Sequence, residues 1–176
     1  MLLEGTNKPE RGDSRLHGVN LLLETAINYK RQRGRFTVHD DRDAIDLDAV
    51  YAFLSTAPWA SGLTRYALEL AIQNSLCFSL VEDTVQIGFA RIITDYVTYA
   101  YLCDVYVIES RRSRGLGFWL IGCVLEHPAI AALKRVALLT HDAQGFYLDL
   151  GFQFAPSPKR YMERMVEIEI RTGLLP

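Results

Sequence analysis

The stretch of this chain that is most informative about its fold is Tyr106-Val-Ile-Glu-Ser-Arg-Arg-Ser-Arg-Gly-Leu-Gly-Phe-Trp-Leu-Ile121. Its pattern predicts a strand, a short basic turn with two glycines, and a helix that begins at once. Gly115 and Gly117 remove side chains where the backbone must bend. Free N–H groups in the first helical turn, flanked by Arg111, Arg112 and Arg114, form a site for phosphate oxygens. The stretch therefore predicts a binding site for a ligand that carries a pyrophosphate.

Length and composition restrict the class of protein. The chain has 176 residues, 49% hydrophobic and 23% charged, which is typical of one soluble globular domain. A net charge of −2 gives no reason to expect a nucleic-acid partner. No apolar run is long enough to cross a bilayer and no signal pattern opens the chain, so we expect a cytoplasmic protein without a membrane partner. Cys77, Cys103 and Cys123 lack metal or disulfide spacing, and we interpret them as buried thiols.

Three segments are expected along the chain. Residues 1–33 form an N-terminal extension, in part mobile because Pro9 and Gly12 interrupt a polar stretch, with a possible helix over residues 18–30. This extension is either a simple arm or a docking helix. Residues 34–170 form the folded domain, and residues 171–176 form a tail.

The elements of the domain follow from periodicity and turn signals. They are a strand at 35–39, helices near 46–54 and 63–71 around a turn at 58–62, strands at 76–81 and 84–94 joined through Glu82-Asp83, a strand at 99–108, a helix ending at His127-Pro128, a buried parallel strand at 136–140, a short helix closed by Gly151, and strands at 152–154 and 161–170. Asp46 or Asp48 is expected to cap the first helix, and Thr140 or Asp142 the short one. This order is that of a mixed α/β domain without an internal repeat.

Three motifs occur in a specific order. The first is Arg112-Ser-Arg-Gly115-Leu-Gly117, the second is the preceding strand Asp104-Val-Tyr-Val107, and the third is Ala143-Gln-Gly-Phe-Tyr147-Leu-Asp-Leu-Gly151-Phe152. Together they resemble the GNAT superfamily of acetyl-CoA-dependent N-acetyltransferases over residues 35 to about 165. The resemblance implies the α/β acyl-CoA N-acyltransferase fold: a mixed, mostly antiparallel sheet flanked by helices, with a splayed central pair of strands.

The resemblance also implies a donor site for acetyl-CoA, without a metal. Backbone N–H groups along the turn would hold the CoA pyrophosphate, contributed by Arg112, Ser113, Arg114, Gly115, Leu116 and Gly117. The strand residues Val105, Tyr106 and Val107 would lie beside the pantetheine arm, with a backbone N–H near the thioester carbonyl. Thr140 stands where many members have an asparagine that contacts pantetheine, and Ala143 opens the third motif at the same site. Tyr147 is placed to donate a proton to the departing thiolate.

The acceptor side is less defined. Asp104 is polar in an apolar strand, so we expect it to point into a cleft or to pair with an arginine, and it is the candidate general base. His141 follows a central strand and is either an acceptor-binding residue or structural. Trp59 and the acidic run from Asp40 to Asp48 lie where the resemblance implies the acceptor pocket, although helix capping also explains such acids.

The sequence thus predicts acetyl transfer to a primary amine by direct attack in a ternary complex. The acceptor is expected to be a small molecule rather than a protein, and the chain a monomer or homodimer. The alternative is a non-catalytic acyl-CoA-binding regulatory module. A P-loop enzyme is disfavoured because the turn lacks the Gly-Lys-Ser/Thr ending.

Overall fold

A computed structural model gives the structure of the protein and describes residues 29–164. The described residues divide into two compact units, residues 29–142 and residues 143–164. The described part of the first unit contains strands β1 (Lys30–Arg33), β2 (Phe36–His39), β3 (Leu76–Glu82), β4 (Val85–Thr94), β5 (Ala100–Val107) and β6 (Val136–Ala137), with helices α2 (Leu47–Leu54), α3 (Arg65–Gln73), α4 (Leu116–Glu126) and α5 (Pro128–Ala131). Short 3₁₀ turns lie at Pro58–Ala60 (η1) and Glu109–Arg111 (η2). The second unit contains α6 (Gln144–Asp149) and η3 (Pro158–Arg160).

The strands form one mixed sheet in the order β1-β2-β3-β4-β5-β6. Each neighbour from β1 to β5 is antiparallel, and β6 runs parallel to β5. Such a parallel pair needs a crossover connection, and α4 and α5 supply it. The predicted mixed, mostly antiparallel sheet is confirmed.

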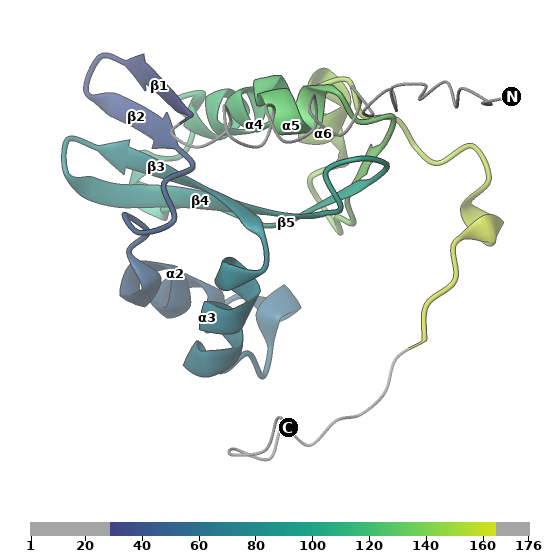
Figure 1. Cartoon of the computed structure of the whole chain (residues 1–176), viewed down its shortest axis with the longest axis horizontal. Coiled ribbons are helices and arrows are strands. Elements are labelled where there is room, and N and C mark those ends of the chain that lie inside the picture. The colour runs from purple at the N-terminus through teal and green to yellow at the C-terminus, as the bar shows by residue number, and fades with distance from the viewer. Residues whose placement is uncertain (1–28, 165–176) are drawn as a thin grey trace, which may run out of the picture. The chain divides into compact units, whose positions relative to one another are not determined.

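Helices cover both faces of this sheet, as Figure 1 shows, with α2 and α3 on one face and α4 on the other. On the first face the helices bury four apolar side chains against three strand residues: Val50, Leu54, Leu68 and Ile72 against Cys77, Phe89 and Tyr106. On the other face α4 buries Leu116, Leu120, Ile121 and Val124. Burial on both faces explains why β3 and β4 read as nearly continuous apolar runs.

The helices α2 and α3 each begin at a side chain that caps the first turn. The Asp46 carboxylate accepts a hydrogen bond from the Ala49 N–H at 2.9 Å, so Asp46 rather than Asp48 begins α2. The Thr64 hydroxyl accepts from the Ala67 N–H at 3.1 Å and begins α3 in the same way. The end of α4 before His127-Pro128 is also as predicted, although Pro128 then opens α5.

The sheet begins earlier than predicted. Lys30–Arg33 pairs with Phe36–His39 as an antiparallel edge strand, so the described end of the expected 18–30 helix is extended backbone, and residues 18–28 lie outside the described residues. Gly34, at φ 61°, makes the tight turn between the two strands. All four side chains of β1 are exposed, so the strand shows no alternation that could reveal it.

The end of the domain also differs from the prediction. The parallel strand is only Val136–Ala137 rather than 136–140, and it is partly buried. The hairpin turn lies at residues 83–84, one residue after the predicted position. Residues 152–154 and 161–164 are not strands, and residues 165–170 lie outside the described residues. Pro156 and Pro158 interrupt this stretch, and proline cannot donate to a strand ladder. None of the helices within residues 29–164 has the length and apolarity needed to span a bilayer.

Candidate functional site

The strand β5 has an open edge. Its pairing with β6 covers only Ala100 opposite Val136 and Tyr101 opposite Ala137, after which the two strands separate. From Leu102 to Val107, β5 is paired with β4 on its other side alone. The predicted splay between the central strands is therefore present, and it leaves backbone donors and acceptors of β5 available to a ligand.

A β-bulge interrupts β5 at this edge. Phe89 lies opposite Tyr106 and Arg91 lies opposite Cys103, so β5 carries one residue more than β4 between the two pairs. Asp104 is at φ 52°, a left-handed conformation that is rare for a residue with a side chain. Gly88 allows the close approach of β4 just beyond the bulge, because a Cβ there would lie 2.8 Å from the Tyr106 carbonyl oxygen.

The bulge changes which residues face the open edge. Before it, the Ala100 N–H donates toward β6, to the Arg135 carbonyl at 3.0 Å. After it, the Ile108 N–H donates toward β4, to the Ile87 carbonyl at 2.9 Å. Strand alternation then directs the backbone groups of Val105 and Val107 to the open edge and those of Tyr106 to β4. The Arg112 Nε bond to the Val107 carbonyl, at 2.9 Å, agrees with this direction.

The glycine turn joins β5 to α4 as predicted. Gly115 is the N-cap of α4 at φ 69°, and a Cβ built there has no atom within 4 Å. Ser113 is also left-handed, at φ 59°. The open space at Gly115, at the N-terminus of α4 where the helix dipole favours anions, fits a phosphate group.

The three arginines of the turn have different partners. Within residues 29–164, Arg114 is exposed and makes no ion pair, so it is available to an anion. Arg112 is exposed but holds the Val107 carbonyl. Arg111, which was expected to flank the phosphate site, instead binds the Glu82 carboxylate at 2.5 Å.

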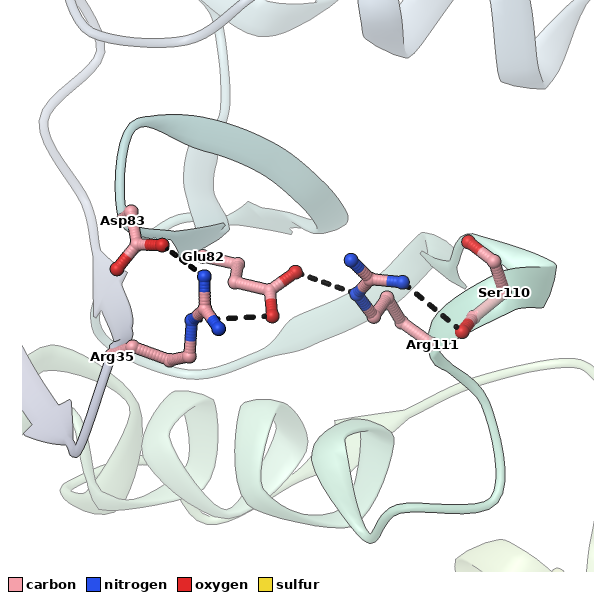
Figure 2. A network of polar contacts seen from close by, with 5 residues as sticks. All are labelled: Arg35, Glu82, Asp83, Ser110 and Arg111. Atoms are coloured by element: carbon pink, nitrogen blue, oxygen red, sulfur yellow. Dashed lines mark hydrogen bonds and ion pairs between the residues drawn. The ribbon is translucent and has the colours of Figure 1, made fainter.

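Glu82 connects the turn to the β-hairpin. Figure 2 shows its carboxylate between two guanidinium groups, with Arg111 on Oε2 and Arg35 at 3.4 Å from Oε1. Arg35 also binds Asp83, and Arg111 donates to the Ser110 carbonyl at 3.4 Å. The Glu82 side chain is only 10% exposed. The network therefore anchors η2, and with it the start of the glycine turn, to the end of β3.

Asp104 pairs with an arginine, one of the two outcomes expected from the sequence. The Arg91 Nε lies 2.6 Å from the Asp104 Oδ2, and both side chains are largely buried. Burial opposes the charge of Arg91, but the acidic groups of Cys103 and Asp104 raise its pKa above the usual value. Arg91 was not singled out from the sequence, where a lone charge in the apolar run of residues 85–94 was the available signal.

Trp59 lines a cavity of about 430 Å³ at the carboxyl end of β5. Its walls are Phe53, Thr56, Ala57, Pro58, Trp59, Ile108, Glu109 and Arg112. Phe53 stacks on Tyr106 with ring centroids 3.9 Å apart, so the Tyr106 side chain belongs to the core beneath the cavity. Burial raises the pKa of Tyr106 to about 12. The cavity joins the predicted acceptor residue Trp59 to the predicted donor residue Arg112, and Asp104 is not among its walls.

The acidic run has structural partners. Asp46 caps α2, Asp48 binds Arg65 at 2.8 Å, and Asp41 accepts from the Asp43 N–H at 3.1 Å. The Asp40 carboxylate lies 3.2 Å from Nε2 of His127, whose side chain is fully buried. Helix capping and pairing thus give Asp40, Asp41, Asp46 and Asp48 structural partners within the fold.

The remaining predicted residues lie near the boundary of the two units. Thr140 is partly buried and His141 exposed, on the irregular segment after β6 in the first unit. In the second unit Ala143 is the N-cap of α6, where Thr140 or Asp142 was expected. The Tyr147 ring packs edge-on against Phe146 and Phe152, at 4.9 and 5.6 Å between centroids. Burial raises the pKa of Tyr147, which keeps its phenol protonated at neutral pH.

The chain is similar to known proteins. The model of the Acetyltransferase (GNAT) family matches residues 41–152. A candidate acetyltransferase from Gibberella zeae is 34% identical over 131 residues, 62% of this chain and 74% of that protein. A candidate GNAT-family acetyltransferase from Xanthomonas campestris pv. campestris, solved as a crystal structure, has 37% identity and a TM-score of 0.73, over 77% of this chain and 96% of that one.

A more distant structure shares the fold. It is a Mycobacterium tuberculosis protein solved in complex with CoA, with 19% identity and a TM-score of 0.55 over 66% of this chain and 70% of that chain. The family match covers the β5 edge, the glycine turn and the Tyr147 segment. This chain belongs to the Acetyltransferase (GNAT) family.

Proposed function

We propose that the protein transfers an acetyl group from acetyl-CoA to a primary amine, by direct attack in a ternary complex. One observation carries the proposal: the open edge of β5 is followed, through the short turn η2, by the left-handed glycine at the start of α4. A strand edge suits the amide-bearing pantetheine arm, and a helix N-terminus suits the pyrophosphate. The two features are adjacent in the chain and in the order that acetyl-CoA requires.

The residues at this edge fit acetyl-CoA. Backbone groups of Val105 and Val107 would pair with the pantetheine amides. The turn from Arg112 to Gly117 would hold the pyrophosphate, with Arg114 neutralising its charge. Thr140 and Ala143 are proposed to complete the donor site from the segment after β6.

The chemistry needs few groups. The amine nitrogen attacks the thioester carbon, the carbonyl oxygen becomes an oxyanion, and the C–S bond then breaks to release the CoA thiolate. The Val105 N–H would stabilise the oxyanion, and Tyr147 would protonate the thiolate. The amine loses its proton to water or to Asp104, the base predicted from the sequence. Holding the two reactants together provides much of the rate enhancement.

The acceptor is proposed to be a small amine with an apolar part. The cavity beside the turn is walled mainly by Phe53, Pro58 and Trp59, with the Glu109 carboxylate available to a cationic amine. A volume of about 430 Å³ lies within the range of small-molecule sites. His141 is a further candidate for acceptor contact.

A thiol-release assay over a panel of primary amines tests the activity. Release of CoA that depends on one class of amine supports the proposal. CoA binding without turnover on any amine would support the alternative, a non-catalytic acyl-CoA-binding module.

Gly115→Trp tests the donor site itself. A bulky side chain at the start of α4 enters the space assigned to the pyrophosphate, so CoA binding should be lost in isothermal titration while circular dichroism stays unchanged. Gly34→Trp is a matched control, because Gly34 is also left-handed and also open to solvent, but lies in the β1–β2 turn. Retained CoA affinity in Gly115→Trp would contradict the assignment.

A further inference from the structure

The bulge in β5 has a conformation that its own sequence does not favour. Asp104 is left-handed inside a strand, where glycine is the usual solution. Aspartate tolerates this conformation better than most residues, but it still needs support from its surroundings. Something in the fold must therefore hold the Asp104 backbone.

Arg91 contacts the bulge from the neighbouring strand. Its Nε donates to the Asp104 carboxylate at 2.6 Å, and its Nη1 donates to the Ser75 hydroxyl at 3.1 Å. Ser75 is buried at the entry to β3. One planar guanidinium thus links the α3–β3 connection, β4 and the bulge of β5 in a fixed geometry.

Stability alone does not explain this ion pair. The Arg91 and Asp104 side chains are 14% and 13% exposed. Replacing such a pair with apolar side chains of similar size is often neutral or stabilising, because both charges lose hydration on burial. The Arg91–Asp104 pair lies at the bulge, where the conformation of Asp104 sets the direction of the following peptide group, the one that carries the Val105 N–H.

That peptide group is the proposed oxyanion donor. The bulge shifts the alternation of β5 by one residue, so that counting back from Ile108 directs the Val105 N–H to the open edge. A small rotation at Asp104 would turn this N–H away. Removal of one oxyanion donor typically lowers kcat by about 10²–10³-fold.

We infer that Arg91 is a positioning residue, which holds Asp104 in its left-handed conformation and thereby aims the Val105 N–H into the cleft. The inference rests on the proposed function. It assigns the Asp104 carboxylate the role of holding Arg91, in place of proton abstraction. The two roles of Asp104, as partner of Arg91 and as general base, predict different values of kcat when glycine replaces Asp104.

The test compares Arg91→Leu, Arg91→Lys and the double variant Arg91→Leu/Asp104→Gly. Arg91→Leu should lower kcat by about 10²-fold, with the CoA Kd unchanged in isothermal titration. Arg91→Lys keeps the positive charge but lacks the planar guanidinium with its several fixed N–H donors, so its kcat should fall less than that of Arg91→Leu. If Arg91→Leu does not fold, Arg91→Lys takes its place in the test. The double variant should regain most of the kcat, because glycine adopts the left-handed conformation without a partner. Arg65→Leu, which breaks the exposed pair with Asp48, is the matched control.

Two results would overturn the inference. One is a wild-type kcat in Arg91→Leu and Arg91→Lys. The other is a folded, CoA-binding double variant that stays as inactive as Arg91→Leu, which would show that the carboxylate itself is required.

A second readout does not depend on turnover. The Val105 amide resonance and its hydrogen-exchange rate should change in Arg91→Leu and return toward wild type in the double variant. An unchanged Val105 amide in Arg91→Leu contradicts the inference even if the wild-type protein acetylates no amine. If the wild-type protein releases no CoA with any amine, the thiol-release assay contradicts the proposed acetyl transfer. The Val105 amide measurement still tests the role of Arg91, so the two failures can be told apart.

Discussion

At the residue scale, Tyr147 is the side chain to which the proposed mechanism gives a defined chemical step, the donation of a proton to the leaving thiolate. Its ring is partly buried between Phe146 and Phe152, and burial raises its pKa. A raised pKa favours the phenol over the phenolate, which is the form that a general acid needs. The environment of Tyr147 thus suits the role that the family motif assigns to it.

Tyr147→Phe keeps the ring and removes the proton. We expect kcat to fall by about 10²–10⁴-fold, the usual contribution of a positioned general acid, with CoA affinity unchanged. Steady-state kinetics and isothermal titration measure the two quantities. Tyr66→Phe, on the exposed face of α3, is the control. A wild-type kcat in Tyr147→Phe would show that the thiolate leaves without this proton.

At the element scale, the connection between β5 and α4 is held in place by β3, a strand that lies earlier in the chain. Glu82, at the end of β3, holds Arg111 of η2 on one carboxylate oxygen and Arg35 of the β1–β2 turn on the other (Figure 2). Largely buried carboxylates with two cationic partners are costly to disturb, because the partners lose their compensation together. The glycine turn is therefore shaped by the sheet as well as by its own glycines.

Glu82→Gln removes the charge and preserves the volume. Loss of its charge-assisted bonds should lower the free energy of unfolding by about 1–3 kcal/mol, and release of Arg111 should weaken CoA binding. Urea denaturation and isothermal titration report the two effects. Asp48→Asn breaks the exposed pair with Arg65 and should cost at most about 1 kcal/mol, with no change in CoA affinity. If Glu82→Gln lowers stability but leaves CoA affinity unchanged, the network supports only the fold.

At the scale of the whole molecule, buried acids predict how stability depends on pH. Burial raises the pKa of the Cys77 thiol from 9.0 to about 12, and the pKa of Cys103 rises likewise to about 12. A group whose pKa is higher in the folded state binds its proton more tightly there. Stability is then fully present below the unfolded pKa and is lost as the pH rises toward the folded value.

The free energy of unfolding should therefore decline from about pH 9 upward, by at most about 1.4 kcal/mol per pH unit for each such thiol. Chemical denaturation between pH 7 and 11 measures this slope. Cys77→Ala should make the alkaline slope shallower, whereas Ser157→Ala, which replaces an exposed side chain that does not titrate, should not change it. An alkaline slope that is the same with and without Cys77 would contradict this origin.

Local sequence signals were sufficient for much of the fold and for the strand-to-helix turn to which the donor is assigned. The two glycines after an aromatic, β-branched strand specify a strand-to-helix turn because only glycine adopts its left-handed start without cost. Asp46 caps its helix through an interaction three residues away. Such contacts are short-range, so residue type and spacing determine them. The order of elements and the mixed sheet follow from the same periodicity.

Only the tertiary structure revealed the edge strand β1 and the ion pairs between residues that are distant in sequence. The edge strand β1 carries only polar, exposed side chains, so nothing but its pairing with β2 marks it as a strand. Arg91 and Asp104 are thirteen positions apart in sequence, and Glu82 and Arg111 twenty-nine, yet both pairs lie within hydrogen-bonding distance. The sequence by itself determined the family, the order of the elements and the left-handed glycine turn before α4. The sheet decided which arginine supports the turn, and which backbone groups of β5 lie at its open edge, because one extra residue in β5 reverses the alternation of every residue that follows.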